Sequence, residues 1–213
     1  MKLVGLLGGT FDPVHCGHIE LAGKAMAEFD LAKVLFLPTA SPPHKRNANV
    51  ASFEHRVKMI LLAIQDDARF ALLEIESKIP APNYTVDTLS VLLRKKDPDN
   101  ELVFIIGLDA FLEIHLWKDH EHVLSRIHFI IAARAGYKTD ELHDYLKLLK
   151  YEKNGNYWCN DASHKKIYYL DCDITDVSSS VVRKKLSAGE SLDEVVPPSV
   201  MEYIHNHKLY RSD

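Results

Sequence analysis

The chain has 213 residues, of which 46% are apolar and 26% are charged, and its formal net charge is −4. This composition is typical of a globular protein with enough apolar residues for a sizeable core. A negative net charge provides no general attraction to a nucleic-acid backbone, so nucleic acid is excluded as the default partner. A bound polyanion would need a local basic site.

The start of the chain, MKLVGLLGGTFD, holds one lysine and a short apolar run that glycines interrupt. That run is too short for a signal peptide or a membrane-spanning helix, so we expect a cytoplasmic protein with no membrane partner. The three cysteines, Cys16, Cys159 and Cys172, are widely spaced and form no CxxC pair. They predict reduced thiols rather than a disulfide framework or a zinc site.

Short runs of branched apolar residues alternate with segments of helical spacing along most of the chain. Strands are expected at 3–7, 34–37, 70–73, 102–106, 129–132 and 167–170, and helices at 19–29, 53–64, 85–93, 120–124 and 142–149. Strand alternating with helix predicts an α/β fold, a Rossmann-like doubly wound parallel sheet. Two segments are expected to be loops: 38–50, which is rich in proline, and 154–166, which is polar and aperiodic.

Near its end, the chain no longer alternates between predicted strands and helices. Two helices are expected at 179–188 and 199–207, joined through Gly189 and the Pro197-Pro198 pair. We therefore expect one domain over residues 1–213, with an α/β core at 1–176 and a small C-terminal helical cap at 177–213. Composition and pattern leave the oligomeric state open.

The most informative string lies where the first predicted strand meets the first helix and has the sequence GGTFDPVHCGH over residues 8–18. In a doubly wound sheet this junction binds phosphates, because free amides and the helix dipole both point at the ligand. His15 and His18 are three residues apart and share one helical face, with Gly17 leaving space beside them. Near a triphosphate each imidazole is driven toward its charged form. The alternative is that the two histidines only cap the helix or pack on the sheet.

The string resembles the signature of the nucleotidyltransferase superfamily, whose second half has the form HxGH. The resemblance implies transfer of a nucleotidyl group from a nucleoside triphosphate without a covalent enzyme intermediate. It implies Mg²⁺ as the cofactor, bound mainly through the phosphates of ATP, with no metal site built from protein side chains. The residues that it implies for ATP binding in this string are Gly8, Gly9, Thr10, Phe11, His15 and His18.

A second string, DVSSSVVR over residues 176–183, also lies at an expected helix start. Taken alone, its serines predict a plain helix N-cap at Ser178 or Ser179. It resembles the ISSTxxR motif of the same superfamily, with valine for isoleucine and Ser180 for threonine. By that resemblance Ser178, Ser179 and Arg183 bind the β- and γ-phosphates of ATP.

Further segments resemble the bacterial nicotinate-nucleotide adenylyltransferases over nearly the whole chain. The PPHK string at 42–45 implies that His44 and Lys45 belong to a basic loop that closes over phosphates, although a solvated loop would have the same composition. The NYT string at 83–85 resembles the family's PSYT segment, with Asn83 for serine. Its Tyr84 and Thr85 are candidate contacts for a pyridine carboxylate.

After the fourth predicted strand, IIGLD at 105–109 resembles the family's IIGxD and is followed by LWK at 116–118. The resemblance implies that Gly107 and Asp109 contact nucleotide, that Trp117 stacks on the pyridine ring, and that Lys118 lies at the substrate. An aromatic face suits a flat ring, but Trp117 is equally typical of a half-buried core residue.

The RAGY string at 134–137 resembles the family's RPGY and implies that Arg134 faces ATP. Ala135 stands where the family has proline, which leaves the position of Arg134 open. Four more histidines, at 115, 120, 122 and 128, have no carboxylate or cysteine at a spacing that completes a zinc site.

Together these strings predict an ATP-dependent nucleotidyltransferase that transfers AMP to nicotinate mononucleotide, giving nicotinate adenine dinucleotide and pyrophosphate for NAD biosynthesis. We expect in-line attack on the α-phosphorus, with His15 and His18 stabilising the α-phosphoryl group and Lys45 and Arg183 the departing pyrophosphate. Two alternatives stay open: another nucleotidyltransferase, such as a phosphopantetheine adenylyltransferase, and a nucleotide-binding sensor without turnover. The preference between nicotinate and nicotinamide mononucleotide also stays open.

Overall fold

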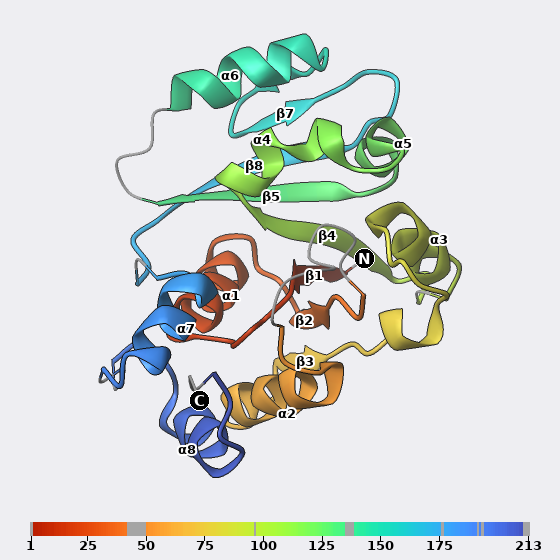
Figure 1. Ribbon diagram of the computed structural model, residues 1–213. Coiled ribbons are helices and arrows are strands. Elements are labelled where there is room, and N and C mark those ends of the chain that lie inside the picture. Colours follow the sequence, from red (N-terminus) through yellow and green to blue (C-terminus); the bar gives the residue numbers. More distant parts are fainter. Residues whose placement is uncertain are drawn as a thin grey trace.

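The computed structural model describes residues 2–41, 50–95, 97–134, 139–175, 177–190, 192 and 194–210, except the side chains of residues 134 and 139. Within these residues the chain forms one eight-stranded sheet with strand order β3-β2-β1-β4-β5-β8-β7-β6 (Figure 1). The strands are β1 (Lys2–Gly9), β2 (Lys33–Pro38), β3 (Phe70–Leu72), β4 (Asn100–Gly107), β5 (His128–Arg134), β6 (Glu152–Asn154), β7 (Tyr157–Cys159) and β8 (Lys166–Cys172).

Helices alternate with the strands. They are α1 (Cys16–Glu28), α2 (Phe53–Ile64), α3 (Thr85–Lys95), α4 (Leu108–Leu112), α5 (His120–Arg126), α6 (Thr139–Leu148), α7 (Ser179–Ser187) and α8 (Pro198–Asn206), with short 3₁₀ turns η2 (Glu76–Lys78) and η3 (Ile114–Leu116). None of the helices in the described ranges is both long and apolar enough to cross a bilayer.

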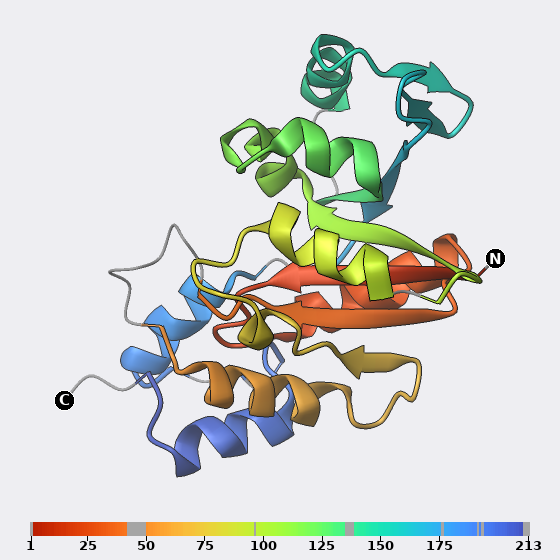
Figure 2. The same ribbon diagram turned by 90° about the vertical axis from the view of Figure 1, so that its right-hand side faces the viewer.

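The six strands β3-β2-β1-β4-β5-β8, in their order across the sheet, all run parallel to their neighbours in this series. This confirms the predicted α/β fold class. Along β1 the buried side chains alternate between the two faces: Leu6 packs under one layer of helices and Leu7 under the other. One layer contains α1, α2, α7 and α8, and the other contains α3 to α6 (Figures 1 and 2). Because the strands are parallel, their carboxyl ends meet along one edge of the sheet, where β1 passes into α1.

The C-terminal helices share a hydrophobic core with the first half of the sheet. Val182 in α7 and Val200 in α8 are fully buried in the same cluster as Leu7. The Ser199 hydroxyl donates a hydrogen bond to the Leu62 carbonyl at the end of α2, at 3.1 Å. The C-terminal helices therefore pack directly on the helices and strands of the first half of the chain.

One prediction was wrong. The segment 154–166 is not a loop throughout, because β6 and β7 form an antiparallel hairpin that extends the sheet beyond β8. Gly155 has a positive φ of 62° at the turn, and Trp158 is 7% exposed. Each strand has three residues, which is too short for an alternating pattern to emerge from the surrounding polar residues. The sheet is therefore mixed rather than wholly parallel.

Candidate active site

The glycine-rich turn connects the central strand β1 to α1. A Cβ added to Gly8 would lie 2.6 Å from Cζ of Phe104, so the strand packs against that ring without room for a side chain. Beyond it, Phe11 is 1% exposed with a positive φ of 50°, and its ring lies against His18 with centroids 4.9 Å apart. The buried Phe11 ring therefore fixes the position of the turn at the N-terminus of α1.

His15 and His18 form a stacked pair at the first turn of α1. His15 is the N-cap, its ring lies 3.6 Å from that of His18, and its backbone N–H donates to Nδ1 of His18 at 3.2 Å. Because Nδ1 accepts this bond, the neutral His18 carries its proton on Nε2, where it is available to donate. Burial and the neighbouring His15 hold the pKa of His18 well below its ordinary value. Without ligand, His18 is therefore a neutral donor rather than a cation.

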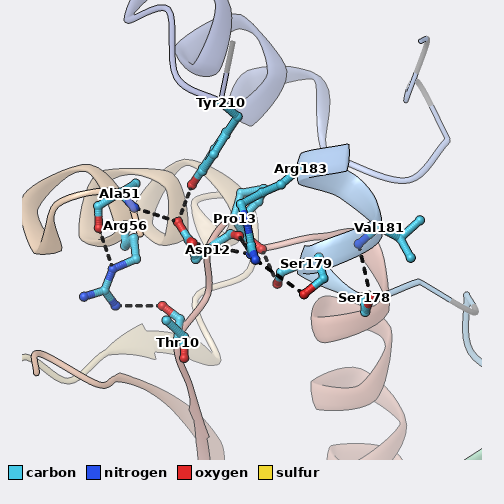
Figure 3. Close-up of polar contacts among 11 residues, drawn as sticks. Thr10, Asp12, Pro13, Ala51, Arg56, Ser178, Ser179, Val181, Arg183 and Tyr210 are labelled. Carbon is cyan, nitrogen blue, oxygen red and sulfur yellow. Dashed lines mark hydrogen bonds and ion pairs between the residues drawn. The ribbon is translucent and has the colours of Figure 1, made fainter. Parts of the chain in front are cut away.

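The second motif meets the first in space, through contacts between residues that lie 166 and 171 positions apart in the chain. Ser178 caps α7, with its Oγ accepting from the Val181 N–H at 3.3 Å. The Ser179 hydroxyl donates to the Pro13 carbonyl at 2.9 Å, and Nη1 of Arg183 donates to the Asp12 carbonyl at 2.7 Å (Figure 3). Two helix N-termini thus lie beside one glycine-rich turn, an arrangement that favours anions.

A cavity of about 490 Å³ opens between these two motifs and the end of β4. Predicted site residues supply much of its polar lining: Gly8, His15, His18, Gly107, Asp109, Ser178 and Ser179. Its apolar lining includes Leu7, Leu21, Ile105, Ala132 and Val177. Such a cavity suits a ligand that has both a flat apolar part and a charged part.

Close packing between α1 and the segment before α7 closes one wall of the cavity. A Cβ on Gly17 would lie 2.9 Å from the backbone oxygen of Thr175, so only glycine allows this approach. On the next turn of α1, Glu20 accepts hydrogen bonds from the Thr175 N–H and hydroxyl, both at 2.7 Å. Lys24 donates to the carbonyl of Asp173. Sequence reasoning missed Glu20, which lies next to the signature but outside it.

The residues predicted to contact the acceptor gather on the other face of the sheet edge. Trp117 is half-buried and packs edge-on against Phe104, the ring that also contacts Gly8. The Lys118 ammonium lies 4.8 Å from the centre of the Tyr84 ring. Thr85 is the first residue of α3. Tyr84, Thr85, Trp117 and Lys118 are not among the residues that line the described cavity. Tyr84 and Trp117 pack instead against the core on the face of the sheet that α3 to α6 cover.

Asn83, which stands where the family has serine, forms hydrogen bonds that hold neighbouring segments together. Its Oδ1 accepts from the Ser41 N–H at 2.9 Å, and its Nδ2 donates to the Glu76 carbonyl at 3.0 Å. Glu76 in turn accepts from the Ala40 N–H at 3.1 Å and from the Thr88 hydroxyl at 3.0 Å. Burial raises the pKa of Glu76. These contacts fasten the start of α3 to the end of β2.

Some of the predicted site residues lie outside the described part of the chain. His44 and Lys45 belong to the range 42–49, which lies outside the described residues, as do Ala135 and the side chain of Arg134. The backbone of Arg134 ends β5 and pairs with Cys172 of β8. Across the described ranges, no three His, Cys, Asp or Glu side chains lie close enough together to hold a metal ion.

Arg56 was not predicted as a site residue, yet it is 2% exposed and lies behind the glycine-rich turn. Its guanidinium donates to the carbonyls of Thr10 at 2.7 Å and Ala51 at 3.1 Å (Figure 3). It also donates to the carbonyl of Thr39 at 2.9 Å. Burial lowers its pKa from the ordinary value. The signal was present in the sequence: Arg56 occupies an apolar position of α2, in helical register with Met59 and Ile60.

Comparisons with known proteins point to one family. The model of the cytidylyltransferase-like family matches residues 6–185. A probable nicotinate-nucleotide adenylyltransferase of Desulfatibacillum aliphaticivorans is 38% identical, covering 97% of this chain and 99% of that protein. Its counterpart in Desulfotalea psychrophila is 39% identical, covering 99% of this chain and 100% of that protein. A Plasmodium falciparum nicotinic acid mononucleotide adenylyltransferase solved with NaAD has a similar fold, with a TM-score of 0.77 at 22% identity, covering 99% of this chain and 98% of that one.

Proposed function

Since this chain belongs to the nicotinate-nucleotide adenylyltransferases, within the cytidylyltransferase-like family, we propose that it transfers AMP from ATP to nicotinate mononucleotide. The products are nicotinate adenine dinucleotide and pyrophosphate. The observation that carries this proposal is the cavity that His15, His18, Ser178 and Ser179 line together. These residues come from the two strings that resemble nucleotidyltransferase motifs.

The reaction is an in-line displacement at the α-phosphorus of ATP. A phosphate oxygen of the mononucleotide forms a new bond to that phosphorus while the bond to the bridging oxygen of the β-phosphate breaks, and pyrophosphate leaves with the electron pair. A phosphate dianion is already a nucleophile, so no general base is needed. Catalysis then consists of positioning the two phosphates and stabilising the charge that develops.

His15 and His18 stabilise the α-phosphoryl group. The Nδ1 of His18 is engaged by the backbone N–H of His15, so Nε2–H is the donor that faces a ligand. Donors fixed in this way need no reorganisation as charge develops in the transition state. The close stack of the two rings makes double protonation unfavourable until a polyanion arrives.

We assign the rest of the predicted contacts to the same bound ATP. Ser178, Ser179 and Arg183 hold the β- and γ-phosphates at the start of α7, with Lys45 assisting the departing pyrophosphate. The backbone of Gly8, Gly9, Thr10 and Phe11 approaches the nucleotide, as do Gly107, Asp109 and Arg134. A Cβ on Gly107 would lie 2.6 Å from Oδ1 of Asp109, so glycine there supports the position of that carboxylate.

The acceptor lies on the α3 side of β1. Trp117 and Tyr84 provide aromatic faces for the pyridine ring, and Thr85 provides a hydroxyl and a backbone amide for its carboxylate. Lys118 and His44 supply positive charge. Lys118 is already paired with Asp87 at 3.1 Å, which holds the ammonium over the Tyr84 ring.

Mg²⁺ fits this site as an ion carried by the triphosphate, whose negative charge it neutralises when bound. The Asp109 carboxylate is exposed and lines the cavity, so its oxygens can reach such an ion or its water. The Asp12 carboxylate is not available for this role, because it is 1% exposed and engaged by Tyr210, Ala51 and Arg183.

A pyrophosphate-release assay with a panel of acceptors tests the proposal. We expect turnover with ATP and nicotinate mononucleotide, slower turnover with nicotinamide mononucleotide, and none with CTP as the donor. A preference for phosphopantetheine would instead indicate a different adenylyltransferase. Binding of ATP without pyrophosphate release from any acceptor would indicate a nucleotide sensor and overturn the assignment.

A further inference from the structure

The buried carboxylate of Asp12 joins three parts of the chain that are far apart in sequence. Its Oδ1 accepts hydrogen bonds from the Tyr210 hydroxyl at 2.7 Å and from the Ala51 N–H at 3.0 Å (Figure 3). Its Oδ2 has no hydrogen bond within the described residues and lies 3.4 Å from Nη1 of Arg183. The mechanism above uses Arg183 but assigns nothing to Tyr210 or to this carboxylate.

Arg183 is held near the glycine-rich turn mainly by a backbone carbonyl, which is a neutral group. Its Nη1 donates to the backbone carbonyl of Asp12 at 2.7 Å, whereas the contact with the Asp12 carboxylate is longer, at 3.4 Å. Its Nη2 lies 3.4 Å from the Ser180 hydroxyl. The side chain remains 28% exposed, so part of the guanidinium faces solvent. A carboxylate at this distance can draw the arginine closer if its own hydrogen bonds change.

Tyr210 controls how many donors that carboxylate has. Tyr210 follows α8, and its hydroxyl contacts Asp12 of the glycine-rich turn, which lies 198 positions earlier in the chain. Burial and the neighbouring Asp12 raise the pKa of Tyr210, so its hydroxyl stays protonated and acts as a donor to Oδ1. A buried carboxylate that loses a hydrogen-bond donor lowers its free energy most by moving closer to the nearest cation. The strongest contact of this kind is a bidentate ion pair with arginine.

We propose that Tyr210 is a positioning residue for Arg183: by occupying Oδ1 of Asp12 it prevents a close Asp12–Arg183 pair and leaves the guanidinium available to polyphosphate. This inference rests on the proposed function, because it assumes that Arg183 meets phosphate oxygens. Tyr210 itself touches neither substrate. The C-terminal end of the chain thereby sets the affinity of the site for triphosphate and pyrophosphate.

Binding of inorganic tripolyphosphate to the full chain, measured by titration calorimetry at constant ionic strength, tests this without turnover. In Tyr210→Phe we expect the Kd to rise roughly fivefold to twentyfold, the usual cost of weakening one charge-assisted hydrogen bond. The KM for ATP should rise by a similar factor, with the KM for the acceptor unchanged. The control is Tyr203→Phe, which removes a hydroxyl on α8 that contacts Nδ1 of His55 on α2 at 2.9 Å. Its Kd should stay within about twofold of the wild type.

A double-mutant cycle separates this role from a structural one. If Tyr210 acts through Arg183, adding Tyr210→Phe to Arg183→Gln should leave the tripolyphosphate Kd unchanged. An equal loss in both backgrounds, or an unaltered Kd in Tyr210→Phe alone, overturns the inference while leaving the proposed function intact. A wild-type protein that binds no tripolyphosphate overturns both, because the phosphate site itself would then be wrong.

Discussion

At the scale of single residues, the proposed chemistry depends on the His15–His18 pair. His18→Ala removes the Nε2–H donor, and losing one preorganised donor to a developing charge costs roughly 10² to 10³ in kcat. We expect that loss with little change in the thermal midpoint, measured by pyrophosphate release and circular dichroism. His122→Ala, at an exposed position of α5, is the matched control and should retain full activity. Near-normal turnover in folded His18→Ala would contradict the assigned role.

The same pair predicts how stability depends on pH. The pKa of His18 lies well below its ordinary value of 6.5, so the unfolded chain takes up a proton that the folded protein resists. The stabilisation from neutral His18 is fully present above pH 6.5 and is lost as the pH falls toward the folded-state pKa. Chemical denaturation at about pH 7.5 and about pH 5.5 should show a larger loss of stability in wild type than in His18→Asn. Equal losses would exclude His18 as a source of the effect.

Two glycines of α1 make a matched pair. In Gly17→Ala the new Cβ would lie 2.9 Å from the Thr175 carbonyl, so the backbone before α7 must move. We expect a loss of about 1 to 3 kcal/mol in the free energy of unfolding, with reduced activity. Gly23→Ala meets nothing within 4 Å and should instead stabilise the helix by about 0.5 to 1 kcal/mol. Urea denaturation of both variants measures the contrast.

At the scale of elements, α2 locks the glycine-rich turn to the end of β2 through Arg56. Arg56→Met would leave the carbonyls of Thr10, Thr39 and Ala51 without this donor. We expect a loss of about 3 kcal/mol or more in the free energy of unfolding. Lys58→Met, at an exposed position on the same helix, should change it by less than about 0.5 kcal/mol. Similar stability of the two variants would mean that Arg56 does not hold these segments together.

The accuracy of the sequence-based prediction differs from one strand to another. Strands β1, β4 and β5 were located closely because they are buried on both faces and are therefore continuous apolar runs. The β6–β7 hairpin was missed, because β7 is stabilised by pairing with β8, and β6 by pairing with β7, rather than by an alternating pattern in these three-residue strands.

At the scale of the whole molecule, we expect residues 1–213 to unfold as one unit. Val200 and Ile204 of α8 are at most 1% exposed in the core that also contains Leu7 and Met59. Deleting residues 198–213 should therefore lower the free energy of unfolding by about 3 to 6 kcal/mol from these two side chains alone. Deleting only residues 211–213 is the control. A truncated chain with unchanged thermal stability would show that the helical cap is a separate unit.

The sequence by itself determined the α/β class, the family and the two motifs that we propose bind phosphate. Burial on a strand and close approach of backbone to ligand both restrict the residue type locally. Only the tertiary structure decided which groups support those motifs. Asp12, Arg56 and Tyr210 each satisfy a buried charge or hydroxyl through partners that no local spacing specifies, such as the 198 residues between Asp12 and Tyr210. The physical reason is that a buried polar group needs a partner in space, and the chain can bring that partner from any distance along its length.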